Sequence, residues 1–253
     1  MKIAFLFPGQ GSQEVGMARD LFSQDDYFND LVVYASDYVK EDLKQLCLKG
    51  PDKKLMKAHY LQPIMTAVSL GYARYIRQAG IVPDYIIGHS LGEITALAAS
   101  GIVSDKQAIA IAAKRGELMD AAASKVDGGM MAVLFVSLDT IEQIIEDIGA
   151  HNKIVIANDN APDQVVLAGE NTTLTQFADI VQERSLGKTR KIVVAGPWHS
   201  PYIKEARVVF EEWAEPIPFR RPSVPLVMNA SSRPEIHPTT IKHLVTWQLT
   251  NAV

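Results

Sequence analysis

The stretch Asp84-Tyr-Ile-Ile-Gly-His-Ser-Leu-Gly92 decides the fold class of this chain. It begins with a short apolar run that predicts a buried strand, and it ends in the motif Gly-x-Ser-x-Gly. After Glu93, the stretch to Ser100 is built from Ile, Thr, Leu and four small residues, which predicts a helix. A strand, a serine between glycines and a helix form the layout of a nucleophile elbow. In that layout the turn presents the hydroxyl of Ser90, and the first amides of the helix, to a reacting group.

Ser90 also has a plainer interpretation, as part of a Gly-Ser turn that caps a helix, because serine is a common N-cap residue. The strand before it and the small-residue helix after it favour a nucleophile instead. Glycines suit such a tight turn, because a Cβ at Gly88 or Gly92 would crowd the neighbouring backbone. We therefore predict that Ser90 is a catalytic nucleophile.

Length and composition describe an ordinary globular protein. The 253 residues suffice for one large domain, or for one domain with a smaller insert. The net charge of −4, without a dense stripe of Lys and Arg, argues against a nucleic-acid partner. The single cysteine, Cys47, excludes an intramolecular disulfide. The apolar run Ile3–Phe7 is too short for a signal peptide, and no apolar stretch reaches membrane-spanning length. We expect a cytoplasmic protein that does not enter a membrane.

Strands and helices alternate along the chain, which predicts an α/β fold. Residues 127–195 carry the order β-α-β-β-α-β, which matches a ferredoxin-like motif. We predict an α/β-hydrolase-like catalytic domain made of residues 1–126 and 196–253, with residues 127–195 inserted as a ferredoxin-like subdomain. The expected strands are Lys2–Phe7, Tyr85–Ile87, Met130–Val136, Ile154–Ala157, Gln164–Ala168, Thr189–Val194 and Val224–Met228. The expected helices fill most of Val15–Gly80, with one start at Gln62-Pro63, and cover 93–100, 105–125 after a Ser104 cap, 139–148, 173–183 and 239–249.

A serine hydroxyl becomes a good nucleophile only when a base takes its proton, and histidine is the usual base. Of the six histidines, His199 follows Gly196-Pro-Trp198, where the chain returns from the predicted insert to the large domain. A loop of that kind is a common place for functional residues. The alternative is a hinge histidine packed for its shape. His89 is adjacent to Ser90, so its side chain points away and is a poor base. The remaining histidines lie in polar segments and are expected to be solvated: His59, His151, His237 and His243.

Arg115 is a charged residue on a predicted apolar helix face. On a helix of 3.6 residues per turn, Lys106, Lys114 and Glu117 mark the opposite, wet face. A buried charge is costly unless it is paired, and no acidic residue lies three or four positions away. Either an acid from elsewhere in the fold neutralises Arg115, which is the usual case, or the guanidinium binds an anionic ligand such as a carboxylate. Its expected apolar neighbours are Ala108, Ile111, Ala112, Leu118, Met119 and Ala122.

A serine, a histidine and an arginine that can bind a carboxylate predict acyl transfer from a substrate whose acyl group carries a free carboxylate. The chain also resembles malonyl-CoA:acyl-carrier-protein transacylases, and the related acyltransferase domains of polyketide and fatty-acid synthases, over essentially its whole length. The elbow is common to many hydrolases, but its combination with a Pro-Gly-Gln-Gly loop and Arg115 is specific. The motifs that carry the resemblance, in the family's order, are Phe7-Pro-Gly-Gln-Gly-Ser-Gln13, Gln62-Pro63, Gly88-His-Ser-Leu-Gly-Glu93, Arg115-Gly116, Asn158 and Asn160 ahead of Gln164-Val-Val-Leu-Ala-Gly169, and Pro197-Trp-His199.

The resemblance implies a role for each matching residue. Ser90 would take the malonyl group from coenzyme A as an ester. His199 would be the general base, first for Ser90 and then for the phosphopantetheine thiol of acyl carrier protein. Arg115 would hold the malonyl carboxylate. The backbone amides of Gln10 and Leu91 would form the oxyanion hole.

The family also implies how the histidine is oriented. A main-chain carbonyl near the end of the chain does this in place of an aspartate, and Gln248 matches that position. Gln62 and His89 would line the substrate pocket. The partners implied are malonyl-CoA as substrate and acyl carrier protein as acceptor, with no bound cofactor and no metal, and we expect a monomer.

The sequence departs from the family pattern at Ala252, where relatives carry a proline, and at Trp198, where they often carry Phe or Ser. A large ring beside the α-carbon of the acyl group leaves little room for an α-methyl. Trp198 therefore predicts a preference for malonyl over methylmalonyl.

Three other functions stay open at this point. An esterase or acyl-thioesterase would share Ser90 and His199 but would have no use for a buried Arg115. A non-catalytic docking subunit would not need the complete set of the three residues. The same transfer could also serve polyketide assembly or a malonate decarboxylase instead of fatty-acid synthesis. Asn158 and Asn160 are favoured as turn formers over contacts to the carrier arm.

Overall fold

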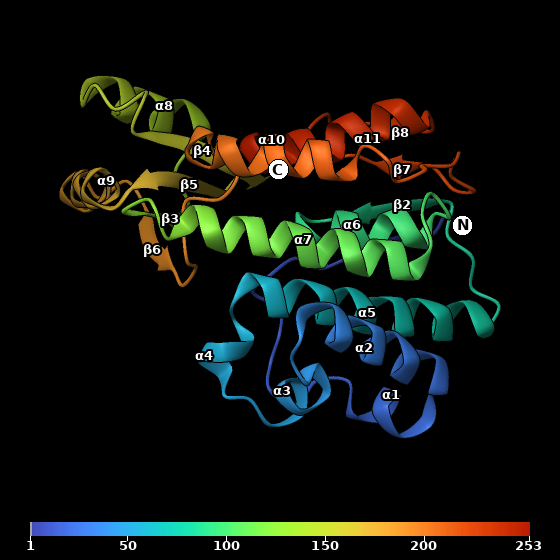
Figure 1. The fold of residues 1–253 in the computed structure, drawn as a ribbon. Helices are drawn as coiled ribbons and strands as arrows, with labels where there is room; N and C mark the ends of the chain where they lie inside the picture. The colour runs from blue at the N-terminus through green and yellow to red at the C-terminus, as the bar shows by residue number, and fades with distance from the viewer. Residues whose placement is uncertain (1) are drawn as a thin grey trace. The chain divides into compact units, whose positions relative to one another are not determined.

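The computed structural model describes residues 2–253, which divide into two compact units (Figure 1). The first unit comprises the chain up to Leu118 together with Val209–Thr246, and the second comprises Met119–Val208 together with Trp247–Val253. The limits of 127 and 195 for the inserted subdomain stay a prediction.

The first unit is built on a four-stranded sheet in the order β1-β2-β7-β8. The strands β1 (Ala4–Phe7), β2 (Tyr85–Gly88) and β7 (Leu226–Val227) are parallel, and β8 (Pro234–Glu235) runs antiparallel to β7. Parallel strands end at a common edge, so the segments that follow β1, β2 and β7 meet there. The predicted elbow begins at this edge, directly after β2.

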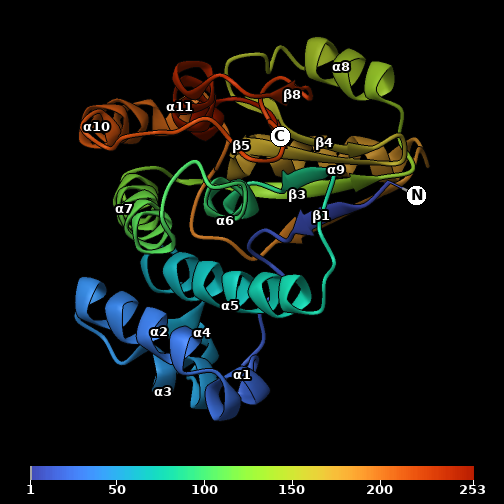
Figure 2. The same cartoon turned by 90° about the vertical axis from the view of Figure 1, so that its right-hand side faces the viewer.

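The helices of the first unit include α5 (Ala58–Gln78), which lies between β1 and the N-terminal helices (Figure 2). Every residue of α6 (Leu91–Ala99) is buried, which explains why its sequence is apolar with small side chains. The helices α7 (Asp105–Ala123) and α10 (Lys204–Ala214) each cross from one unit into the other. The others are α1 (Arg19–Gln24), α2 (Asp26–Val39), α3 (Leu43–Lys49), α4 (Asp52–Leu55) and α11 (Pro238–Trp247).

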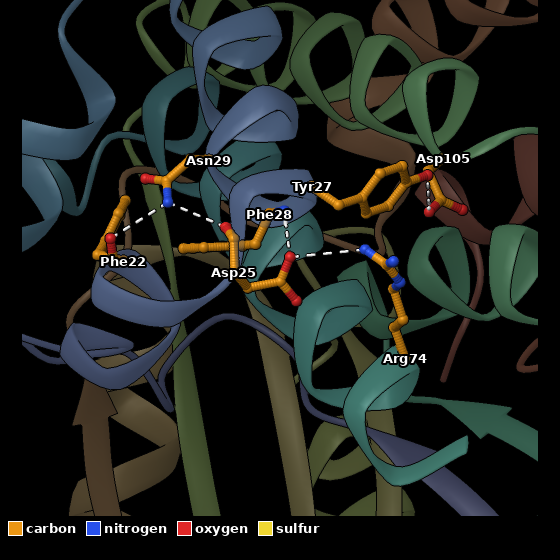
Figure 3. A network of polar contacts seen from close by, with 7 residues as sticks. All are labelled: Phe22, Asp25, Tyr27, Phe28, Asn29, Arg74 and Asp105. Carbon is orange, nitrogen blue, oxygen red and sulfur yellow. Dashed lines mark hydrogen bonds and ion pairs between the residues drawn. The ribbon is translucent and has the colours of Figure 1, made fainter. Parts of the chain in front are cut away.

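A chain of polar contacts joins α2, α5 and α7 at the surface of the first unit (Figure 3). Asp25 caps α2 by accepting a hydrogen bond from the Phe28 amide, and it forms a 3.5 Å ion pair with Arg74. The Arg74 guanidinium lies 4.3 Å from the centre of the Tyr27 ring. The Tyr27 hydroxyl donates a 2.8 Å hydrogen bond to Asp105. Burial, followed by this hydrogen bond, raises the pKa of Tyr27 to about 12. The contacts fix the relative positions of three helices whose sequences lie far apart.

The sequence analysis made two errors about helices: one helix start was wrong, and one helix was not predicted. Gln62-Pro63 does not start a helix, because α5 begins at Ala58 and contains Pro63 in its interior. The packing of α5, which is buried at every position from Leu61 to Val68, overrides the local preference of proline for a helix start. The second error is α10, which no pattern in the sequence analysis predicted. The Ser104 cap of α7 is confirmed, since Gln107 N donates to the Ser104 hydroxyl at 3.2 Å.

The second unit contains an antiparallel sheet in the order β4-β5-β3-β6. Helices α8 and α9 cover one face of this sheet, because both contribute side chains to a core with β3 and β5. Strand order and connections are those of a ferredoxin-like motif, which confirms the predicted fold class. Val253 adds to the β4 edge by hydrogen bonds to Ala157 O and from Asp159 N. The elements are β3 (Gly128–Leu134), α8 (Leu138–Asp147), β4 (Ile154–Ala161), β5 (Gln164–Glu170), α9 (Asn171–Glu183) and β6 (Lys188–Ile192), with two short 3₁₀ helices at Pro201–Ile203 and Gln248–Thr250.

Across residues 2–253, none of the helices combines the length and the apolar character needed to cross a lipid bilayer.

Candidate active site

Ser90 lies in the turn between β2 and α6 with φ 49° and ψ −104°, a conformation that L-residues rarely adopt. The turn is possible because glycines stand on both sides. A Cβ on Gly88 would overlap the main chain of Gly92, and a Cβ on Gly92 would overlap the carbonyl of Phe7. The predicted strand, Gly-flanked serine and helix are therefore all present. This backbone is the strained turn of a nucleophile elbow.

Arg115 is buried in α7, with 1% of its surface exposed, and its guanidinium reaches the elbow. One terminal nitrogen, Nη2, donates a 3.1 Å hydrogen bond to the Ser90 hydroxyl. The other, Nη1, donates a 2.9 Å hydrogen bond to the side-chain carbonyl oxygen of Gln62, which is fully buried in α5. The structure thus brings the predicted serine, arginine and glutamine into one cluster.

The charge of Arg115 is set by burial and by Glu93. Burial lowers the pKa of Arg115 to about 10, and the negative charge of the buried Glu93 opposes this shift. The guanidinium is therefore charged at neutral pH. An acid from α6 acts on Arg115, as the first alternative of the sequence analysis expected, while Nη2 lies at the Ser90 hydroxyl. Binding of an anionic ligand by Arg115 stays a prediction.

A close helix contact places the Arg115 side chain. A Cβ on the next residue, Gly116, would overlap the carbonyl of Ala58 at the start of α5. Glycine at this position lets the backbones of α5 and α7 approach each other without an intervening side chain. Because of this approach, Arg115 on α7 and Gln62 on α5 lie within hydrogen-bond distance.

Two main-chain amides of the first unit are suited to binding an anion. Leu91 N is the first amide of α6, and amides in the first turn of a helix have no acceptor within the helix. Gln10 follows β1, and its side chain donates a 3.3 Å hydrogen bond to Met56 O, which anchors the loop. Within residues 2–253, the main-chain N–H groups of Gln10 and Leu91 donate to no protein acceptor. His89 is exposed, and its ring lies close to Gly9 of the same loop.

The remaining predicted site residues belong to the second unit. His199 is buried, has a left-handed backbone with φ 55°, and lies after the buried Trp198. Its Nδ1 lies 2.8 Å from the main-chain carbonyl oxygen of Gln248. A carbonyl can only accept, so Nδ1 carries a proton, and in the neutral imidazole the lone pair therefore lies on Nε2. This tautomer leaves Nε2 able to act as a base.

Sequence reasoning missed Asn229, which follows β7. Its side-chain oxygen accepts a 2.7 Å hydrogen bond from Ser90 N, and its side-chain nitrogen donates a 2.6 Å hydrogen bond to Gly88 O. One signal could have found it: Asn229 comes directly after the predicted strand Val224–Met228. A polar residue at the carboxyl end of a parallel strand is a candidate for the site that such ends share.

In the part of the chain that the structure describes, no cluster of three or more His, Cys, Asp or Glu side chains could hold a metal ion. The first unit instead offers an alcohol beside a buried cation and two main-chain amide donors. These groups suit nucleophilic chemistry on a substrate that carries negative charge.

Comparisons with known proteins agree with this chemistry. A family model described as an acyl transferase domain matches residues 4–253. A polyketide biosynthesis malonyl CoA-acyl carrier protein transacylase of Bacillus velezensis is 36% identical over 234 residues, which cover 92% of this chain and 78% of the relative. A malonyl CoA-acyl carrier protein transacylase of Bacillus subtilis is 31% identical over 253 residues, with coverages of 100% and 80%. A malonyl-transacylase solved in complex with a type II PKS acyl-carrier protein has a TM-score of 0.92 and 31% identity, with coverages of 100% of this chain and 82% of that chain.

Proposed function

Since the chain belongs to the acyl transferase domain family, we propose that it moves a malonyl group from coenzyme A, through an ester on Ser90, to the phosphopantetheine thiol of acyl carrier protein. The names of the relatives support the donor and the acceptor. The observation that carries the proposal is the 3.1 Å hydrogen bond from the buried Arg115 guanidinium to the Ser90 hydroxyl. A cation in that position suits an acyl group with its own carboxylate.

In the first half-reaction, Ser90 Oγ attacks the thioester carbon and passes its proton to His199 Nε2. The bond between carbon and Oγ forms, the bond between carbon and sulfur breaks, and His199 returns the proton to the departing sulfur of coenzyme A. In the second half-reaction the carrier thiol gives its proton to His199 and attacks the ester, and Ser90 Oγ regains a proton. The cycle is a ping-pong transfer that consumes no other reactant.

The oxyanion of each tetrahedral intermediate would accept hydrogen bonds from the main-chain amides of Gln10 and Leu91. Gln248 would keep His199 in the tautomer whose Nε2 can take a proton, through the 2.8 Å contact between its carbonyl and Nδ1. Gln62 would hold one side of the Arg115 fork while the other side binds the carboxylate. His89 and Trp198 would line the pocket.

We also propose that the enzyme needs no cofactor and no metal, and that it works in the cytoplasm as a monomer. Lewis-acid help is dispensable in this scheme, because thioesters are reactive and the main-chain amides stabilise the oxyanion. The relatives include a polyketide biosynthesis enzyme, and the chemistry proposed for Ser90 is the same with a carrier protein of a polyketide or of a fatty-acid system.

Intact-mass measurement tests the proposal. After brief exposure to malonyl-CoA, we expect a malonyl adduct that digestion locates on the peptide containing Ser90. Adding acyl carrier protein should move the adduct to the carrier. Rapid hydrolysis without a carrier product would support the thioesterase alternative instead, and an adduct on another peptide would contradict the assigned nucleophile.

Arg115→Ala should lower kcat/KM for malonyl-CoA by about 10²- to 10³-fold, because truncating one partner of a buried, hydrogen-bonded charge pair has an effect of that size. Reactivity with acetyl-CoA, which lacks the carboxylate, should be unchanged or raised. The comparison of kcat/KM for the two thioesters in wild type and variant measures the effect. Arg115→Lys is the matched control for charge. It should keep more malonyl activity than Arg115→Ala, because lysine retains the positive charge and lacks only the planar fork of arginine. Equal losses for acetyl and malonyl would rule out this role.

The Trp198 ring should make the wild-type enzyme prefer malonyl-CoA to methylmalonyl-CoA by roughly ten- to a few hundred-fold, the usual effect of one methyl group in a close-packed pocket. Trp198 is 4% exposed, so a smaller side chain at this position would leave space. Trp198→Phe should therefore reduce the preference. Competition assays with the two thioesters give the ratio of kcat/KM directly. Equal kcat/KM values for the two thioesters in the wild type would show that Trp198 does not discriminate against the α-methyl group.

A further inference from the structure

The hydrogen-bond ladder between β2 and β7 is short. Its last paired residues are Ile87 and Val227, so the backbone of β7 no longer supports β2 where the elbow begins. The turn that follows holds Ser90 at φ 49°, and a conformation of this kind persists only when its surroundings hold it. The support at this point comes from a side chain.

Asn229 lies two residues beyond the last paired residue of β7, and its amide bridges the elbow. Its oxygen accepts from Ser90 N at 2.7 Å and its nitrogen donates to Gly88 O at 2.6 Å, so it holds the backbone on both sides of His89. A primary amide, like a peptide group, offers both an N–H donor and a carbonyl acceptor. The side chain thus continues the ladder past the end of the strand.

The backbone of Asn229 is fixed as well. Its N–H donates a 2.7 Å hydrogen bond to the carboxylate of Glu93, which is fully buried in α6. The adjoining turn is closed by hydrogen bonds from Met228 N to Arg233 O and from Ser232 N to Met228 O. The elbow, the start of α6 and the end of β7 therefore form one hydrogen-bonded frame around the serine.

We propose that Asn229 is a positioning residue for the nucleophile: its amide holds the strained turn in the orientation that aims the Ser90 hydroxyl at the substrate. The inference rests on the proposed function only in taking Ser90 as the nucleophile. A displacement of the hydroxyl of about 1 Å would slow acylation by about 10²-fold without changing the groups that bind the substrate. The effect should therefore fall on the rate constant of acylation and spare the affinity for malonyl-CoA.

Two variants test different parts of this contact. Asn229→Ala removes both hydrogen bonds. Asn229→Asp keeps the volume and the acceptor for Ser90 N, but it places a carboxylate oxygen against the carbonyl of Gly88. Both variants should slow acylation. If one of them does not fold, the other still tests the inference.

Asn29→Ala is the matched control. The side-chain nitrogen of Asn29 donates to two backbone carbonyls, those of Phe22 and Asp25, and Asn29 lies in α2 within the same unit (Figure 3). This variant, like Asn229→Ala, loses two hydrogen bonds between an asparagine side chain and the backbone, but at a position outside the elbow. Its single-turnover acylation rate should equal that of the wild type even where its melting temperature is lowered.

The measurement combines single-turnover acylation, followed by quenched intact mass, with calorimetric binding of malonyl-CoA in the Ser90→Ala background. We expect the Asn229 variants to acylate Ser90 about 10²-fold more slowly, with dissociation constants within about threefold of the Ser90→Ala reference. An acylation rate within threefold of wild type, a loss confined to binding, or an equal slowing in Asn29→Ala would overturn the inference. A wild type that forms no adduct on Ser90 would instead overturn the proposed function, so the two failures are distinguishable.

Discussion

Ser90→Ala is expected to abolish the malonyl adduct and to lower transfer to acyl carrier protein by about 10⁴-fold or more, the size of effect seen when a nucleophilic serine is removed. The loss has a simple cause, because alanine offers no atom that can form the ester. Radiolabelled malonyl-CoA and intact mass measure the adduct, and a coupled assay measures the transfer.

The same variant should keep its affinity for malonyl-CoA. Arg115 loses its hydrogen bond to the serine hydroxyl, but its charge and its contact with Gln62 remain. Ser23→Ala is a suitable control, because Ser23 is an exposed serine of the same unit whose hydroxyl donates a hydrogen bond to Asp20 O, far from the elbow in the sequence. It should transfer malonyl at the wild-type rate. A persistent adduct on Ser90→Ala would show that another residue is the nucleophile.

The second large effect is expected at His199. His199→Ala should slow acylation by about 10²- to 10⁴-fold, the range that general-base catalysis contributes. The reason lies in its geometry: the contact of Nδ1 with the Gln248 carbonyl fixes the tautomer with a basic Nε2. Removing the imidazole leaves water as the base for the serine proton. Single-turnover acylation at constant pH measures the rate constant.

His151→Ala provides the comparison, since His151 is an exposed histidine of the same unit. It should acylate like the wild type. Binding of malonyl-CoA should be similar in both histidine variants, because the proposed carboxylate ligand is Arg115. If His199→Ala acylates as fast as His151→Ala, His199 is a packed loop histidine, which is the plainer alternative.

The elbow was predictable from sequence because its chemistry is local. Gly88 and Gly92 are required by backbone contacts within the turn and with the end of β1. Two glycines at this fixed spacing around a serine can be recognised in the sequence. Arg115 was predictable as a buried cation for a similar reason, since its helix face is apolar over several turns. Its partners were not predictable, because Gln62 and Glu93 come from other helices that the periodicity of α7 does not report.

Helix α10 was missed because its pattern is mixed. Ala206, Phe210 and Ala214 are buried at a spacing of four, but Val208 and Val209 are exposed and obscure the helical period. Asn229 was missed for a different reason. A single asparagine in a turn is usually a turn former, and its bond to Ser90 joins residues 139 positions apart.

The overlap that any side chain at position 92 would make with the Phe7 carbonyl has a consequence for mutagenesis. Here two stretches of backbone meet directly, and under the proposed mechanism the groups that stabilise the reacting oxygen are peptide N–H groups of this same region. Alanine scanning leaves peptide groups untouched, so any loss that it produced at Gln10 or at the buried Leu91 would report on the side chain and not on the N–H group. Proline, or an ester in place of the amide, would be needed to reveal what they contribute.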